Sequence, residues 1–213
     1  GKAIAKFYDK VLIRDLDVNQ FEKGLEFLHI CIPYSKNFIK IVSENIETYE
    51  PYAVIIHSTV PVGTTKTLYD KYKNIIHSPC RGVHPDLYEG IKTFIKYIGT
   101  DGAGIGRIVS EHFDKIGIKN MVVRKSETTE LLKLLDTTYY GVAIAYHDYA
   151  NKLCEKLGLN FDVVMTHANN SYNEGYMKLG KPEVIRPILY PPEGKIGGHC
   201  VRENSILLKK QFG

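Results

Sequence analysis

The chain has 213 residues, of which 44% are hydrophobic and 24% are charged, a composition typical of a folded globular protein and not of a disordered or collagen-like one. No apolar run approaches the ~18 residues of a membrane span, and the first residues lack the apolar stretch of a signal peptide. We therefore expect no membrane partner. The formal net charge is only +4, with basic residues scattered among acidic ones, so nucleic acid is a poor candidate partner.

The first half of the chain alternates short apolar runs with amphipathic stretches, the pattern of an α/β sheet. Because the runs are almost continuously apolar, they predict parallel strands that are buried on both faces. The predicted strands are residues 10–14, 28–32, 52–57, 75–76, 96–99 and 120–124, and the predicted helices are residues 38–49, 64–72 and 105–115. The segment Gly102-Ala103-Gly104-Ile105-Gly106 has the spacing GxGxG, which favours a flexible turn before a helix over a phosphate-binding loop.

From Ser126 onward the sequence becomes helical for about thirty residues, with Ser126 as the predicted N-cap and Gly158 as the predicted stop. A helix of ~30 residues is ~45 Å long, so we expect it to link two units or to pair two subunits. A second helix is predicted from Asp162 through His167, and another over residues 202–210. Four prolines exclude a regular helix over residues 181–195.

The four cysteines lie far apart without a CxxC pair, which favours a reducing cytoplasm and gives no support to a metal site or a disulfide framework. Cys200 is the best candidate nucleophile, because two glycines precede it closely and the N-terminus of the following helix would favour its thiolate. Cys31, Cys80 and Cys154 are expected to be small buried residues.

Three further places suggest chemistry. Lys133 lies on the long helix with Thr137 and Tyr140 on the same face, where its ammonium could stabilise an alkoxide or position a water; the alternative is a solvated lysine. The turn at residues 58–65 follows a buried strand and opens a helix, where an open α/β sheet binds its ligand, and its amides and hydroxyls could hold a phosphate or ribose. The Asp15 carboxylate could accept hydrogen bonds from the two ribose hydroxyls of an adenosine; the alternative is an ordinary loop aspartate.

Together these segments resemble the UDP-glucose/GDP-mannose dehydrogenase family, whose members oxidise the C6 alcohol of a nucleotide sugar to a carboxylate with NAD. The resemblance follows the chain in order through His29-Ile30-Cys31-Ile32-Pro33, residues 58–65, Pro85-Asp86-Leu87-Tyr88-Glu89-Gly90, Glu130-Leu131-Leu132-Lys133, Ala150-Asn151-Lys152-Leu153-Cys154-Glu155 and Gly197-Gly198-His199-Cys200. In the family, the cysteine captures the intermediate aldehyde as a thiohemiacetal, a second oxidation gives a thioester, and water releases the acid.

The resemblance implies a role for individual residues. Cys200 matches the family's nucleophile, Lys133 its helix lysine and Thr59 a threonine near the reacting centre. Asp86 and Glu89 fall in the loop that carries family acids. The implied cofactor-binding residues are Gly1, Asp15, Pro33, Ser58, Thr59 and Arg202, with Asp15 matching the ribose-binding aspartate. The family also implies a nucleotide-sugar substrate like UDP-glucose or GDP-mannose, a place in polysaccharide biosynthesis, and a homodimer formed through the long helix.

The sequence departs from the family pattern at several positions. Asn204 stands where the family has an aspartate, and an asparagine can orient a water but cannot take its proton. Glu203 replaces a lysine that meets cofactor phosphate, a reversal that Arg202 would partly offset, and Thr137 replaces an asparagine. Because Gly1 matches the last glycine of the cofactor fingerprint, we expect the first strand, and also a C-terminal nucleotide-sugar domain, to be missing from this chain.

The predicted fold class is thus α/β, with a Rossmann-like parallel sheet that lacks its first strand, followed by a long helix and a small all-α domain. The predicted domains are an incomplete NAD-binding domain at residues 1–124 and a helical dimerisation domain at residues 125–213 that carries the Cys200 loop. The predicted function is NAD-dependent oxidation of a nucleotide sugar. A 3-hydroxyacid dehydrogenase, which needs no such cysteine, and a non-catalytic dimerising module are the alternatives.

Overall fold

The computed structural model describes residues 1–82, 85–194 and 199–213, and the side chains of His199 and Cys200 lie outside the described part. The chain divides into two compact units, residues 1–133 and residues 134–213. The division falls inside the long helix, whereas the predicted domain boundary, at residues 124 and 125, falls just before it. The two units are described separately below.

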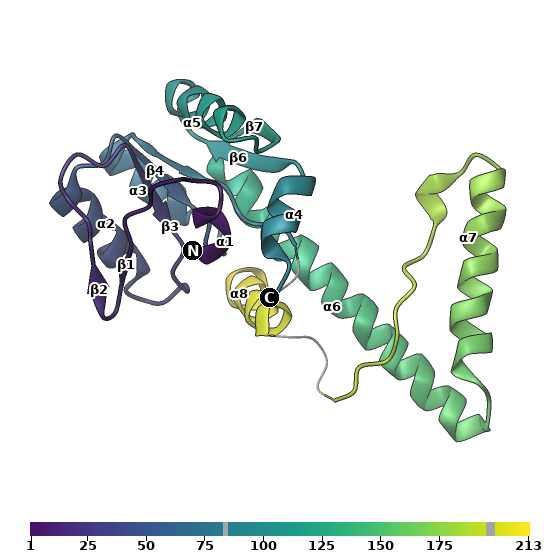
Figure 1. Ribbon diagram of the computed structural model, residues 1–213. Helices are drawn as coiled ribbons and strands as arrows, with labels where there is room; N and C mark the ends of the chain where they lie inside the picture. The colour runs from purple at the N-terminus through teal and green to yellow at the C-terminus, as the bar shows by residue number, and fades with distance from the viewer. Residues whose placement is uncertain (83–84, 195–198) are drawn as a thin grey trace. The chain divides into compact units, whose positions relative to one another are not determined.

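A five-stranded sheet organises the first unit (Figure 1). Its strands, in spatial order, are β3 (Phe27–Ile30), β4 (Ala53–Ile56), β5 (Ile75–His77), β6 (Lys96–Thr100) and β7 (Asn120–Arg124). The pairs β3–β4, β4–β5 and β6–β7 are parallel, which confirms the predicted α/β class with a mostly parallel sheet. All four residues of β4 are buried, as a central strand covered on both faces requires.

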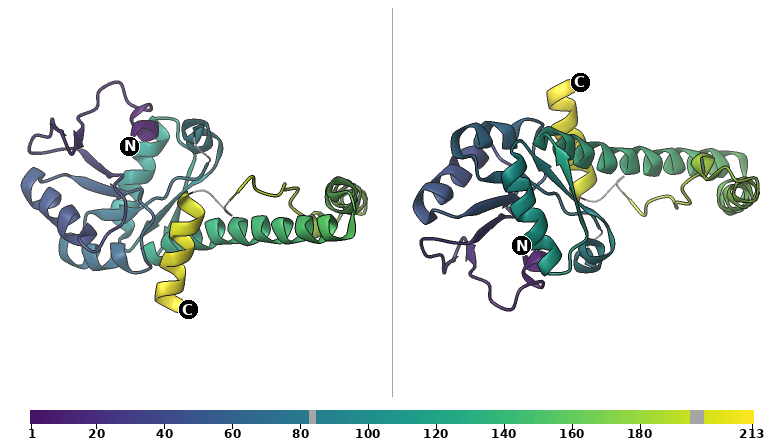
Figure 2. Two further views of the ribbon diagram at one scale, coloured as in Figure 1. Left: turned by 90° about the horizontal axis from the view of Figure 1, so that it is seen from below. Right: turned by 90° about the horizontal axis from the view of Figure 1, so that it is seen from above.

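Helices cover both faces of this sheet (Figure 2). Val54 and Ile56 of β4 point into one apolar cluster, which includes side chains of α2 (Phe38–Tyr49) and α3 (Thr64–Tyr72). Ala53 and Ile55 point into the opposite cluster, which includes Val109 and Phe113 of α5 (Ala103–Lys115). The alternation of one strand between two clusters follows from its period of two residues. The predicted helices and strands between residues 28 and 124 are confirmed to within a few residues.

The predicted strand at residues 10–14 is wrong. Only Arg14 and Asp15 are extended, as β1 (Arg14–Asp15), and they pair antiparallel with β2 (Val18–Asn19) in a two-stranded hairpin. The segment folds back on itself because Ile13 exchanges hydrogen bonds with Gln20, its amide donating to the side chain and its carbonyl accepting from the amide. This local closure replaces pairing with the main sheet, and Ile13 is 50% exposed.

One pair of strands departs from the parallel pattern of the sheet. β6 runs antiparallel to β5, with His77 opposite Gly99. The described residues between them form one short helix, α4 (Leu87–Thr93), and the chain re-enters the sheet beside the end of β5 that it left. A parallel strand would need a crossover back to the other edge. A four-residue helix, α1 (Lys2–Ala5), begins the chain and was not predicted.

The second unit is helical. It contains most of α6 (Ser126–Leu157), a π-helical turn at Asp162–His167 that continues into α7 (Ala168–Lys178), a 3-10 turn at Pro182–Val184, and α8 (His199–Phe212). Gly158 has φ 65°, so the predicted stop of the long helix is confirmed. The last helix begins at His199 and not at residue 202 as predicted. Within the described part of the chain, no helix is long and apolar enough to cross a membrane.

Candidate functional site

The turn after β4 carries the predicted residues Ser58 and Thr59 at the carboxyl edge of the sheet. The Ser58 hydroxyl donates to the Ile32 carbonyl at 2.6 Å, which ties the end of β4 to the segment after β3. Ser58 is buried, Thr59 is half-buried and Pro33 is exposed. Ser58 therefore fixes the shape of this edge with a hydroxyl that is already bonded, while Thr59 and Pro33 remain accessible beside it.

Glu130 occupies the N-terminus of α3. Its fully buried carboxylate accepts hydrogen bonds from the Gly63 amide at 2.6 Å and from the Thr65 amide at 2.8 Å. Gly63 has φ 93°, a conformation that favours glycine. Burial raises the pKa of Glu130, and these hydrogen bonds oppose the shift. The amides that the sequence suggested for a phosphate are thus filled by a side chain of the protein itself.

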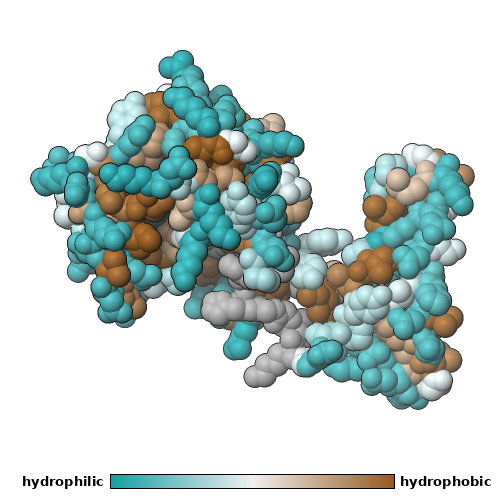
Figure 3. All heavy atoms as spheres, viewed as in Figure 1, coloured by the Kyte–Doolittle hydropathy of each residue, from teal (hydrophilic) through white to brown (hydrophobic). Residues whose placement is uncertain are grey.

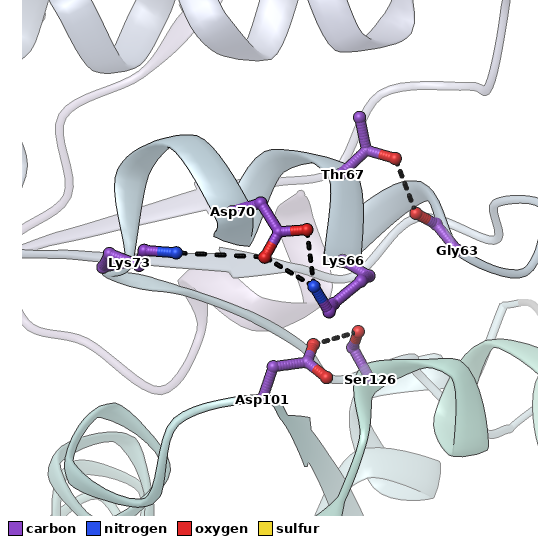
Figure 4. Close-up of polar contacts among 7 residues, drawn as sticks. All are labelled: Gly63, Lys66, Thr67, Asp70, Lys73, Asp101 and Ser126. Atoms are coloured by element: carbon purple, nitrogen blue, oxygen red, sulfur yellow. Dashed lines mark hydrogen bonds and ion pairs between the residues drawn. The ribbon is translucent and has the colours of Figure 1, made fainter.

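Two contacts anchor the start of α6 to the sheet. The first is the Glu130 bond to the turn at residues 58–65, and the second is made by Ser126, whose hydroxyl donates to Asp101 at 2.6 Å (Figure 4). Ser126 is the first residue of α6, and its hydroxyl is a donor to Asp101, not the acceptor that an N-cap side chain provides. Lys133 lies almost one turn beyond Glu130, half-buried. The helix that carries Lys133 is therefore fixed to the turn that carries Thr59.

The exposed side of α3 carries an ordinary charged surface. Lys66 and Asp70 form an ion pair one helical turn apart at 2.5 Å, and Lys73 approaches the same carboxylate at 3.8 Å (Figure 4). All three side chains are at least 41% exposed, so water and salt screen the pairs and they contribute little to stability. These charges form an ordinary solvated helix surface and are not part of the candidate site.

His77, at the end of β5, is buried beside this edge. Its Nε2 lies 3.1 Å from the Ser58 carbonyl and its Nδ1 lies 2.7 Å from the Thr129 hydroxyl. Because a carbonyl only accepts, Nε2 carries the proton, and a neutral ring then accepts from Thr129 through Nδ1. Burial lowers the pKa of His77 to about 3, which keeps the ring neutral. His77 thus links β5 to both the β4 turn and α6.

A second, partly buried chain of rings crosses the same sheet. His57 Nδ1 lies 2.8 Å from the Ser78 carbonyl, His57 Nε2 lies 2.9 Å from His29 Nδ1, and the Tyr8 hydroxyl joins His29 to His112 at 3.0 and 2.7 Å. Burial lowers the pKa of all three histidines. Since the chain ends on a carbonyl, neutral rings admit one direction of donation, from His112 through Tyr8 and His29 to His57.

The remaining predicted residues of the first unit lie on its surface. Gly1 precedes α1, and Asp15 lies in the β1–β2 hairpin, where its carboxylate accepts from the Leu16 amide at 2.8 Å. Asp86 precedes α4 and Glu89 lies within it, and both are exposed. Asp15 does not follow a strand of the main sheet, because the predicted strand before it did not form. The geometry thus brings together Ser58, Thr59 and the start of α6, but not Asp15.

The other predicted residues belong to the second unit. Thr137, on α6, is half-buried, and Arg202, on α8, is exposed. Asn204 is only 5% exposed, and its Nδ2 has no hydrogen-bond partner among the described residues. Cys200 lies in the first turn of α8, and its side chain falls outside the described part. α8 packs against α6 where a Cβ on Gly141 would lie 2.5 Å from Val201.

Several residues that shape this site were not singled out from the sequence as such. Glu130 was named only as part of the segment Glu130-Leu131-Leu132-Lys133, although it caps α3. His29 and His57 were included in predicted strands without a role for their rings, and His77 directly follows the predicted strand at residues 75–76. Their signal was present, because each sits in an apolar run of one sheet, and a polar ring in such a run must find buried partners. Which partners it finds depends on strand order.

Comparison with known proteins is consistent with this arrangement. No family model matches the chain. The UDP-N-acetyl-D-mannosamine dehydrogenase of Methanocaldococcus jannaschii is 27% identical over 198 residues, which cover 84% of this chain and 43% of that protein. The chain therefore spans less than half the length of this relative.

Among solved structures, the UDP-D-ManNAc dehydrogenase of Pyrococcus horikoshii has a TM-score of 0.69 at 20% identity, covering 89% of this chain and 47% of that one. The 3-hydroxyisobutyrate dehydrogenase of Mycobacterium tuberculosis has a TM-score of 0.60 at 14% identity, covering 87% and 66%. At such identities the likeness concerns the fold alone. The family resemblance read from the motifs and this sequence comparison point to the same proteins, because the chain is similar to UDP-N-acetyl-D-mannosamine dehydrogenases over most of its own length.

Proposed function

We propose that this protein is an NAD-dependent dehydrogenase that oxidises the C6 alcohol of a nucleotide sugar to the acid, with Cys200 as the nucleophile that holds the intermediate. Sequence similarity to UDP-N-acetyl-D-mannosamine dehydrogenases supports this proposal, and it makes a UDP-linked N-acetylhexosamine the first substrate to try. UDP-glucose and GDP-mannose are the next. The spaced cysteines support a cytoplasmic location.

The observation that carries the proposal is the attachment of α6 to the carboxyl edge of the sheet. Glu130 binds the Gly63 and Thr65 amides, which fixes the half-buried Lys133 near the turn of Thr59. Open α/β sheets bind their ligands at this edge. A lysine ammonium held there can stabilise negative charge on a substrate oxygen, while Thr59 offers a hydroxyl that can orient the same group.

The proposed hydride acceptor is NAD, which would take the hydride released from the sugar carbon. The described residues fit this cofactor only in part. The N-terminus of α3 is filled by Glu130, and the Ser58 hydroxyl is bonded to Ile32, so this turn provides no free cradle for a diphosphate. Thr59 and Pro33 are the accessible candidates for contact with the cofactor. Asp15 and Arg202, both exposed, stay candidates for the ribose and the phosphate.

In the second unit, the proposed roles centre on α8. Cys200 would hold the substrate carbon as a thiohemiacetal and then as a thioester. Asn204, one turn further along, carries a buried Nδ2 without a hydrogen-bond partner among the described residues, so it can donate to an oxygen or orient a water but cannot act as a base. Thr137 would contact the substrate, and Glu89 would serve as an acidic group of the same reaction.

The experiment is a turnover assay of a full-length version of the protein with UDP-N-acetyl-D-mannosamine, UDP-glucose and GDP-mannose, each with NAD, and with a 3-hydroxyacid as the alternative substrate. We expect NADH and a uronic acid in a ratio of two to one from a nucleotide sugar, and loss of acid formation in Cys200→Ser. Cys154→Ser, at a buried cysteine of α6, is the matched control. Acid formation at the wild-type rate by Cys200→Ser would exclude the covalent route, and turnover of only the 3-hydroxyacid would exclude the substrate class.

We further propose that the protein is a homodimer paired through α6. The second unit bears apolar surface (Figure 3), and one stripe of α6 repeats at spacings of four and three residues: Leu135, Tyr139, Val142, Tyr146, Tyr149 and Leu153, each at least 41% exposed. Such a repeat is the seam of a helix pair. We expect light scattering to give a dimer mass, and Tyr146→Glu to give a monomer, whereas Lys152→Glu, off the stripe, leaves the dimer intact. A monomeric wild type would refute this pairing.

A further inference from the structure

The first unit buries a lysine at the end of its sheet. Lys96, the first residue of β6, is only 3% exposed. Its Nζ donates to the Ser78 carbonyl at 2.8 Å, to the Pro79 carbonyl at 3.2 Å and to Cys80 Sγ at 3.6 Å. An ammonium has three N–H groups, so these three acceptors use all of them. The predicted strand included Lys96 only as a β residue, and no role in the proposed reaction explains it.

The charge of this lysine needs a partner. An ammonium taken out of water without a counter-charge costs far more than a buried hydrogen bond returns. Two of the three acceptors are neutral carbonyls, so the Cys80 sulfur is the acceptor here that can carry a negative charge. Burial lowers the pKa of Lys96, and the neighbouring Cys80 is the first influence that opposes the shift. Lys96 therefore sets next to the Cys80 sulfur either an ammonium, which would stabilise a thiolate, or a neutral amine, which would accept the thiol proton.

Either arrangement activates the sulfur. The thiolate is the nucleophilic form of cysteine, and an adjacent neutral amine is a base that generates it. The pairing is built into the sheet, because β5 and β6 are antiparallel with His77 opposite Gly99, and continuing that register sets Cys80 level with Lys96. Cys80 thus differs from a cysteine that merely fills space.

Cys80 is also within reach of solvent. It follows the carboxyl end of β5 and is half-buried, at the edge of the sheet where ligands approach. Cys31 follows the end of β3 and is half-buried too, but burial raises the pKa of its thiol. The two cysteines form a natural comparison, because they share one edge and one exposure class, and Lys96 Nζ donates to the Cys80 sulfur whereas it acts on Cys31 through its charge alone.

We propose that Cys80 is a nucleophilic thiol, activated by Lys96, that exchanges with small-molecule disulfides to form a mixed disulfide at the edge of the sheet. The Cys80 sulfur attacks one sulfur of the disulfide, a new S–S bond forms, and the old S–S bond breaks. The new bond uses an electron pair of the Cys80 sulfur, and the pair of the old S–S bond leaves with the departing sulfur, which takes the Cys80 proton by way of Lys96 and leaves as a thiol. The Cys80 sulfur is thus oxidised from the thiol to the disulfide level, and one sulfur of the small molecule is reduced from the disulfide to the thiol level.

The test measures thiol reactivity cysteine by cysteine in the whole chain. Samples are treated near neutral pH with iodoacetamide, or with glutathione disulfide, and the modified peptides are quantified over time by mass spectrometry. An ordinary thiol is only a few per cent thiolate at this pH, and a fully formed thiolate gains about tenfold in rate after its lower intrinsic nucleophilicity is counted. We expect Cys80 to react about tenfold faster than Cys31 with both reagents.

Two variants of the lysine separate activation from exposure. Lys96→Met, which keeps the length of the stem and removes the charge, should bring the Cys80 rate down to that of Cys31. Lys96→Arg, which keeps the charge, should retain most of the rate advantage of Cys80 over Cys31. The Cys31 rate, measured in the same samples, reports any loosening of the sheet. Equal rates for the two cysteines in the wild type would overturn the proposal, as would a Cys80 rate unchanged in a folded Lys96→Met. If Lys96→Met does not fold, the wild-type comparison decides.

Discussion

The buried histidines make the first unit sensitive to acid, and His77 shows this most simply. Its ring is fully buried and holds the Ser58 carbonyl and the Thr129 hydroxyl in the neutral form. Burial lowers its pKa from 6.5 to about 3. Because the pKa in the folded chain lies below that in the unfolded chain, the unfolded chain binds a proton that the folded one does not. Stability is therefore complete above about pH 6.5 and falls as the pH drops toward 3.

The size of the effect follows from the shift. Between about pH 7 and about pH 5, a group with these two pKa values costs the folded state about 2 kcal/mol. His29, whose pKa burial also lowers to about 3, adds a similar loss, and His57 acts in the same direction. A domain of this size is stable by only about 5–15 kcal/mol. We therefore expect the first unit to lose a large part of its stability by about pH 5.

The assay is urea unfolding followed by far-ultraviolet circular dichroism across this pH range. His77→Gln removes the titrating ring and keeps groups that can donate and accept, so its unfolding free energy should lose about 2 kcal/mol of pH dependence. His167→Gln, at an exposed position of the π-helical turn, is the matched control and should follow the wild type. Subtracting the unfolding free energy of the wild type from that of each variant at the same pH removes the contribution of the second unit.

Proton NMR of the histidine rings gives a direct check, because it is measured on the wild-type chain and does not depend on whether a variant folds. The His77 ring signal should not move between about pH 8 and about pH 5 in the folded chain, since a group with a pKa near 3 stays neutral there. A His77 signal that titrates near pH 6.5, or an unchanged pH dependence in His77→Gln, would refute the assignment of a neutral, buried ring.

The remaining predictions concern the contacts that hold α6 to the sheet. Glu130→Gln replaces one acceptor oxygen by a donor that faces an amide N–H, so it should lower the unfolding free energy of the first unit by about 2–3 kcal/mol. Glu111→Gln, at an exposed position, should change this free energy little. Equal effects of the two variants would contradict the capping role of Glu130. Gly99→Ala would set a methyl group 2.2 Å from Thr129 Oγ1 and should cost about 1–3 kcal/mol. Gly104→Ala, on α5 with open space around its Cα, should be neutral or stabilising by up to about 1 kcal/mol. If Gly104→Ala lowered the unfolding free energy more than Gly99→Ala, α6 would not lie against β6 as described.

Local pattern was sufficient where one segment decides its own structure. The apolar stripe of residues 38–49 predicts α2 with its observed bounds, and Gly158 predicts the end of α6 through the conformation that it alone adopts easily. The strand predicted at residues 10–14 did not form, although its apolar pattern is as good as that of the other predicted strands. A strand also needs a neighbouring strand to pair with, and here Ile13 exchanges hydrogen bonds with Gln20, which lies only a few residues further along the chain.

The candidate site divides in a similar way. The motif order was enough to relate the chain to the nucleotide-sugar dehydrogenases, because residue types at fixed places in the chain can be compared without coordinates. Which group binds the amides of the turn at residues 58–65 could not be deduced from the sequence. Its amides look free in the sequence, and they are filled by Glu130, which lies far along the chain.

The sequence by itself therefore determined the α/β class, most of the helices and strands, and the resemblance of the chain to the nucleotide-sugar dehydrogenases. Only the tertiary structure decided which buried polar groups meet. The antiparallel entry of β6 sets Lys96 beside Cys80, the pairing of β3 with β4 sets His29 beside His57, and the start of α6 brings Thr129 to His77. The physical reason is that secondary structure follows from the pattern within one segment, whereas these hydrogen bonds depend on distances of about 3 Å between segments that the sequence keeps apart.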